Sequence, residues 1–234
     1  MKPVIRCLLP LSLLLASQAQ ANLTIHPMRT SVDGKRPTQI RVYSQSTQPQ
    51  YVQVSLRRIV NPAEETEHEV ELDPEEAAIA VTPAKFALAG GGNRLIRVVP
   101  LRPPALETAY RVYFEGVSGP EGADLADGEG ADAQVGVSLV WGALVNVLPA
   151  DAHVELRVDS GTLLNLGTAR VGITSVADCV GSRCTAHDIS RALYPGGVLN
   201  LPFDVRPGHT VQLRYRLTRD GHREHVQTLI PAAI

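Results

Sequence analysis

The sequence has little of what nucleic-acid binding, membrane spans and helical folds require. Its basic residues are scattered along 234 residues, and the net charge of −2 gives no positive field for a nucleic acid. After a short apolar run near the N-terminus, no segment reaches the length of a transmembrane helix. Apolar residues at helical spacing are nearly absent. These absences favour a soluble β protein that does not span a membrane.

Motifs for catalysis, cofactors and metals are missing too. No Gly-x-Ser-x-Gly nucleophile motif occurs, and the glycines at residues 90–92 lack the Lys-Ser/Thr of a phosphate loop. His222 and His225, three apart on a strand, would face opposite sides and would not share a metal. The acidic run at residues 64–69 lacks the glycine turn of a calcium loop. We therefore expect no catalytic residue, no cofactor and no metal site.

Residues 1–21 have the pattern of a secretory signal peptide. A basic start precedes an apolar run at residues 8–16, and Ala19 and Ala21 place small residues at the cleavage positions. Cleavage after Ala21 would remove Cys7 with the signal. The sequence therefore predicts an exported protein whose mature chain begins at residue 22.

Two cysteines remain in the predicted mature chain, Cys179 and Cys184. In an exported protein, a disulfide is the default for such a pair. With only four residues between them, the bridge would clip a local hairpin and would stabilise less than one that closes a long loop. A zinc site is the alternative, but no matched pair of histidines accompanies the cysteines.

Short runs of alternating apolar and polar residues recur along the chain, which is typical of half-buried strands. Turn residues such as Asp33-Gly34, Pro207-Gly208 and Asp220-Gly221 fall between the runs. This spacing predicts an all-β protein built from β-sandwiches. The runs are residues 23–25, 39–43, 51–56, 94–99, 110–114, 135–147, 153–158, 163–173, 198–205, 211–217 and 225–230.

Two stretches lack the strand pattern. Residues 61–78 are acidic and contain proline, which predicts a solvated loop with room for a short helix. Residues 116–132 are rich in Gly, Ala and Asp, which predicts a mobile loop. A break near Pro149, after the longest run, divides the predicted mature chain into domains at residues 22–149 and 150–234, each large enough for its own core.

The run at residues 135–147 is the most informative feature of the sequence. Val135, Val137, Leu139 and Trp141 share one face, because side chains alternate along a strand. The run is longer than the usual strand of about five or six residues. From the pattern alone, it fits either a central core strand or an open edge that pairs with a partner chain.

Several segments, in this order, resemble those of a known family. They are Arg29 with the apolar-Asp-Gly turn at residues 32–34, the Pro-bearing Val81-Thr-Pro83, the Arg-bearing strand at residues 93–98, the aromatic strand at residues 110–115, and the alternating strand that ends at Pro149. Together they resemble the PapD-like periplasmic pilus chaperones of the chaperone–usher pathway. The resemblance covers nearly all of the predicted mature chain.

This resemblance implies a fold and a function. The fold would be two immunoglobulin-like β-sandwich domains in a boomerang arrangement with a cleft between them. The protein, in the periplasm, would be a non-enzymatic chaperone that delivers pilus subunits to an outer-membrane usher. A pilus subunit is an incomplete sandwich, and the chaperone lays its own strand into the exposed groove. In this sequence Val135, Val137 and Leu139 match the side chains that fill the groove, and Trp141 extends the row.

The family also binds the terminal carboxylate of the subunit with two basic residues in the cleft, because a carboxylate that leaves water needs charged donors. Arg29 matches the first of these residues. Leu144 occupies the position where the family has a lysine, and residues 135–149 contain no Lys or Arg. Either another residue, such as Arg97 or Arg111, completes the anchor, or the chain belongs to a divergent branch.

Two functions from other classes fit the sequence less well. A secreted pilin or adhesin subunit would be about one domain with a donor arm near its N-terminus, whereas this chain enters a strand within a few residues of the predicted cleavage site. A secreted hydrolase would need a convergent acid, base or metal set, and the sequence offers none. Exposed apolar edges also self-associate, so a self-capping dimer of the free protein stays open.

Overall fold

The computed structural model describes residues 23–73, 75–117 and 139–231. The predicted signal peptide, most of the predicted mobile loop, and the candidate residues Val135 and Val137 lie outside the described residues. Apart from a 3₁₀ turn at Thr218–Asp220, every regular element in the described ranges is a β-strand. Within those ranges no helix has the length and apolar character of a membrane span, and no cluster of His, Cys, Asp and Glu is placed to hold a metal ion.

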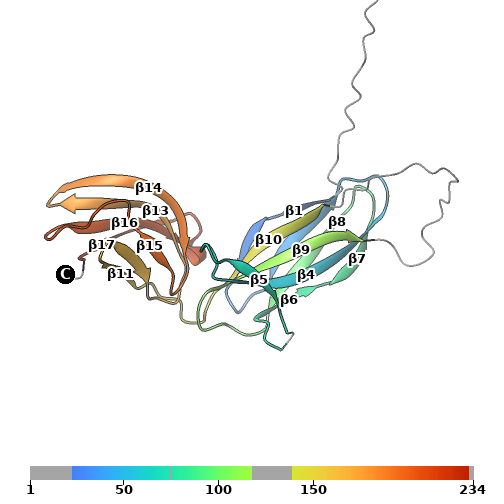
Figure 1. Cartoon of the computed structure of the whole chain (residues 1–234). Helices are drawn as coiled ribbons and strands as arrows, with labels where there is room; N and C mark the ends of the chain where they lie inside the picture. The colour runs from blue at the N-terminus through green and yellow to red at the C-terminus, as the bar shows by residue number, and fades with distance from the viewer. Residues whose placement is uncertain (1–22, 74, 118–138, 232–234) are drawn as a thin grey trace, which may run out of the picture.

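The N-terminal part of the chain forms a β-sandwich of two sheets (Figure 1). The smaller sheet has the order β1-β3-β8-β6, with strands at Leu23–His26, Thr38–Ser44, Asn93–Pro100 and Ile79–Thr82. The larger sheet has the order β2-β10-β9-β4-β5, and β7 also pairs with β4. Its strands are β2 (Arg29–Val32), β10 (Val140–Val147), β9 (Thr108–Val117), β4 (Gln50–Val60), β5 (His68–Glu71) and β7 (Lys85–Leu88).

The C-terminal part forms a second, smaller sandwich. A sheet with the order β11-β12-β15 comprises Leu156–Asp159, Thr162–Asn165 and Val198–Asn200. A sheet with the order β14-β13-β16-β17 comprises Arg183–Leu193, Val171–Val180, Thr210–Leu217 and Glu224–Leu229. Figure 1 shows the two sandwiches joined end to end with a bend between them. The predicted fold class, two immunoglobulin-like β-sandwich domains, is confirmed.

Each sandwich has its own apolar core, as the alternation in the sequence predicts. Ile40 and Val42 of β3 and Ile96 and Val98 of β8 are fully buried in the first core. The second core is built in the same way from strands β11, β12, β13 and β16. Alternate residues point inward because a strand has a period of two, so each run of the sequence contributes one apolar face. The domain boundary at Pro149 stays a prediction, and residues 148–155 between the two sandwiches contain no strand.

Two sequence predictions about strands were wrong. Residues 61–78 are not only a loop, because β5 lies within them and pairs with β4, and the described part of this stretch contains no helix. Strands β6, β7 and β14 lie outside the predicted runs, and the run at residues 163–173 divides between β12 and the start of β13. Edge strands β5 and β14 bury few of their side chains, so neither shows a clear apolar face in its sequence. Strands β6 and β7 have only four residues each, too few for a clear alternation.

The predicted disulfide is present. Cys179 and Cys184 are directly opposite each other in the β13–β14 hairpin, and their sulfur atoms are bonded. Gly181 lies in the turn with a φ of +57°, a conformation that glycine adopts without a steric penalty. The bridge therefore clips a local hairpin at its tip, as the short spacing predicts.

Candidate partner-binding site

Strand β10 is fully paired along one half only. Residues Leu144–Val147 pair with β9 on one side and, in parallel, with β2 on the other. Val140–Ala143 pair with β9 alone within the described residues. The first half of β10 therefore leaves its second row of backbone hydrogen-bonding groups available to another strand, as an open sheet edge does.

The side chains of β10 change from buried to exposed towards this open half. Ala143, Val145 and Val147 are fully buried in the core of the first domain. Trp141 lies on the same face and packs against that core as a partly buried side chain. Leu139 and Val140, at the start of the open half, are 48% and 50% exposed. The structure thus places Leu139 at an accessible apolar edge and holds Trp141 largely against the chain's own domain.

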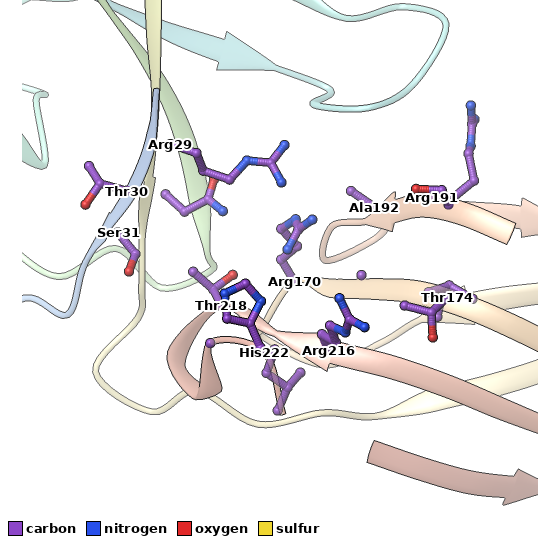
Figure 2. Close-up of a pocket in the computed structure, with 16 residues that line it drawn as sticks. Arg29, Thr30, Ser31, Arg170, Thr174, Arg191, Ala192, Arg216, Thr218 and His222 are labelled. Carbon is purple, nitrogen blue, oxygen red and sulfur yellow. The ribbon is translucent and has the colours of Figure 1, made fainter. Parts of the chain in front are cut away.

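Arg29 lies beside this edge, at the start of β2. Its backbone partner in the sheet is Leu144 of β10, and the Leu144 N–H donates to the carbonyl of Met28 at 2.9 Å. The Arg29 side chain is exposed. It extends into the space between the two domains (Figure 2). The structure therefore brings the predicted anchor residue to the inter-domain cleft, next to the strand with the open edge.

The cleft has a volume of about 610 Å³ and is lined by both domains. Arg29 comes from the first domain, and Arg170, Arg191, Arg216 and His222 come from the second. No Asp or Glu in the described part of the chain is among the lining residues. In Figure 2 the guanidinium groups of Arg29 and Arg170 extend towards the same space, whereas that of Arg191 extends away from it. The cleft is therefore suited to an anionic group.

Leu144 forms part of the joint between the domains. It packs against a buried cluster of Ile59 and Ala109 from the first domain and Tyr194 from the second. The Tyr194 hydroxyl donates to Asn146 Oδ1 at 2.9 Å, and burial raises the pKa of Tyr194 to about 12. An apolar residue at position 144 thus stabilises the inter-domain contact, which a lysine ammonium at the same place would not.

Glu107 makes a second, polar contact between the domains. The residue is 4% exposed, and its side chain accepts hydrogen bonds from the Arg170 N–H at 2.8 Å and from the Thr218 hydroxyl. Its own N–H donates to the carbonyl of Thr168 at 2.9 Å. Burial raises the pKa of Glu107, and the hydrogen bonds from Thr218 and Arg170 oppose that rise. This carboxylate fixes the backbone at Arg170 relative to the first domain.

The two arginines proposed from the sequence as a second anchor are differently placed. Arg97 lies on β8, in the opposite sheet of the first domain, and lines neither hollow that contains Arg29. Arg111 lines a smaller hollow with Arg29, but its Nε lies 2.7 Å from Glu69 Oε1, and Glu67 lies 3.6 Å from its guanidinium. Two carboxylates therefore already compensate the charge of Arg111.

Sequence reasoning missed three residues of the joint and cleft: Glu107, Arg170 and Tyr194. None belongs to a motif, because each acquires its role only when the two domains meet. Asn146 did carry a signal, since it is a polar residue inside an otherwise apolar strand and is 2% exposed. A buried amide requires a hydrogen-bond partner, which predicts a specific polar contact at that position.

Comparisons with known proteins give sequence and structural relatives. No protein-family model matches the chain. A CS1 fimbrial subunit of Escherichia coli is 30% identical over 188 residues, which are 76% of this chain and 79% of the relative. A crystal structure of the class 5 fimbriae chaperone CfaA matches with a TM-score of 0.75 at 24% identity, over 90% of this chain and 100% of that chain. A structure described as a chaperone–tip adhesin complex of CFA/I fimbriae biogenesis matches with a TM-score of 0.74 at 25% identity, over 91% of this chain and 100% of that chain.

Proposed function

Because the chain belongs to the PapD-like family of periplasmic pilus chaperones, we propose that it binds and stabilises pilus subunits by donor-strand complementation and delivers them to an outer-membrane usher. The single observation that carries this proposal is the half-open edge of β10 beside Arg29. Residues 1–21 would direct the chain to the periplasm and would then be removed. The activity would be binding and release, without a chemical step.

The open edge gives the proposed binding two components. Backbone groups of Val140–Ala143 have no partner on the side away from β9 in the described structure, and a strand of a pilus subunit would pair with them. Exposed Leu139, and Val135 and Val137 on the same face of the predicted strand, would enter the apolar groove of that pilus protein. Each Å² of apolar surface removed from water contributes roughly 25 cal/mol of favourable free energy to the complex. The covered groove would then no longer expose apolar surface that leads to aggregation.

Arg29 would orient the pilus subunit on this strand. Its exposed guanidinium lies at the cleft next to β10, and it would bind the C-terminal carboxylate of the bound pilus protein. A charge-assisted hydrogen bond of this kind fixes the register of the added strand as well as its affinity. Delivery would follow when the strand of the next pilus subunit replaces β10 in the groove.

A structural role in the pilus is the second candidate, since the Escherichia coli relative is called a fimbrial subunit. A fibre protein would polymerise, whereas a chaperone would hold one pilus subunit in a one-to-one complex. Tagged protein purified from the periplasm, followed by mass spectrometry and light scattering, separates these outcomes. We expect a one-to-one complex with a pilus subunit. Filaments of this chain, or no associated pilus protein in cells that assemble pili, would contradict the proposed function.

A further inference from the structure

We propose that Arg170, from the second domain, is the second cation of the carboxylate site, so that the terminal carboxylate of a pilus subunit is bound between the two domains. This inference rests on the proposed function and names a residue that the sequence pattern does not indicate. Arg29 of the first domain and Arg170 of the second both line the cleft, and both also line the smaller hollow. In Figure 2 their guanidinium groups extend towards a common space.

The first domain offers no other cation for this site among its described residues. Leu144, at the position of the family's lysine, is packed into the apolar joint. Arg111 is compensated by Glu69 and Glu67, and Glu67 is the acidic residue that lines the smaller hollow. None of the ion pairs among the described residues includes Arg29 or Arg170.

Arg170 is held in place for such a role. Its backbone N–H donates to Glu107 of the first domain at 2.8 Å. Its guanidinium carbon lies 5.7 Å from the centre of the Tyr194 ring, in the range of a cation–π contact. Tyr194 is in turn held by Asn146 of β10. A side chain fixed at both its backbone and its guanidinium loses less entropy when it binds an anion.

The charges of the two arginines favour an anion between them. Two guanidinium groups that face one space, neither of them in an ion pair among the described residues, repel each other, and a carboxylate between them would relieve that repulsion. A guanidinium presents a planar fork of donors that matches a carboxylate, so one from each domain would bind both of its oxygens. A site built in this way would be complete only at the domain angle seen here, and the bound carboxylate would in turn favour that angle.

The experiment compares binding of a free acid with binding of an amide. The probe is a synthetic peptide with the last strand of the pilus subunit that co-purifies with the wild-type protein, made with either a C-terminal carboxylate or a C-terminal amide. Isothermal titration calorimetry gives both dissociation constants. We expect the wild-type protein to prefer the acid by roughly ten- to a hundred-fold, the range for hydrogen bonds between charged groups. Arg170→Ala should remove most of this preference, and Arg170→Lys should restore part of it.

Arg191→Ala is the matched control, because Arg191 lines the same cleft but extends away from Arg29. It should keep the full preference for the acid. If Arg170→Ala does not fold, Arg170→Gln keeps much of the length of the side chain over Tyr194 and should give the same loss.

An unchanged preference for the acid in a folded Arg170 variant would overturn the inference and leave the chaperone function intact. A wild-type protein that binds the acid and the amide equally would do the same. Failure of the wild-type protein to capture any pilus subunit would overturn both proposals.

Discussion

Strand β14 and the first half of β10 each pair with a neighbouring strand on one side only, and their side chains on that open edge differ. β14 is the edge of its sheet, most of its side chains are exposed, and its sequence includes Arg183, Asp188 and Arg191. β10 contains no charged residue, and its open half begins with exposed Val140, directly after exposed Leu139. Charges on an edge discourage pairing with another chain, whereas an aliphatic edge permits it. The comparison indicates that the open half of β10 is kept available, while β14 is protected.

The largest expected effect comes from charging the aliphatic edge. Leu139→Asp should reduce capture of the pilus subunit by more than about a hundred-fold, because an unpaired carboxylate would enter an apolar groove at a cost of several kcal/mol. Val137→Asp should act in the same way. The measurement is pull-down of the co-purifying pilus protein, with circular dichroism to check the fold.

Val180→Asp is the matched control at the β14 hairpin. Val180 is 53% exposed, close to the 48% of Leu139, but it lies at the tip of the β13–β14 hairpin. Capture by this variant should equal that of the wild-type protein. Normal capture by Leu139→Asp would remove the distinction between the two edges.

The second largest effect is expected at Arg29, beside β10, and not at Arg183 of β14. Arg29→Ala should weaken capture by roughly ten- to a hundred-fold while the fold stays intact, because a charge-assisted hydrogen bond to the carboxylate is lost. Arg183→Ala, on the protected strand, should leave capture unchanged. Surface plasmon resonance with the purified pilus subunit measures both. An Arg29 variant with wild-type affinity would reject the anchor.

The third effect is on stability alone, because the disulfide lies in the β13–β14 hairpin and not at the open half of β10. Cys179→Ser with Cys184→Ser should lower the free energy of unfolding by about 2 kcal/mol, the value expected for so short a closed loop. Capture by the folded variant should not change, because the hairpin is remote from β10. Thermal unfolding and pull-down are measured together. Loss of capture at a temperature where the variant is folded would show that the hairpin takes part in binding.

The smallest effect lies at the joint that connects the two regions. The pKa of Glu107 is raised, chiefly by burial, from an ordinary value of 4.5. At a pH between the pKa of Glu107 in the unfolded chain and its higher pKa in the folded protein, the folded protein binds more protons than the unfolded chain. The stability of the fold therefore falls as the pH rises through that interval. Glu107→Gln can accept from the Arg170 N–H and donate to Thr218, and it does not titrate. The midpoint of thermal unfolding, measured across a pH series, should therefore lose the part of its pH dependence that begins near pH 4.5 and extends upward.

Much of this molecule follows from its sequence, and the misses have two physical causes. The alternating pattern of β10 and its lack of charged residues are visible in the sequence, because the buried positions of the strand favour apolar side chains. Edge strands β5 and β14 show no such pattern in their sequences, because most of their side chains are in contact with water. Arg170 and Glu107 lie 63 residues apart and meet only across the joint, so no local pattern connects them.

Trp141 gives the molecule a built-in optical reporter. It is the sole tryptophan in the sequence. It lies in the half of β10 that pairs with β9 alone, and its indole nitrogen has no hydrogen-bond partner among the described residues. A guest strand laid beside it would change the polarity around the ring. The emission of one native chromophore would thus follow, without any label, how fast a cargo is taken up and handed on.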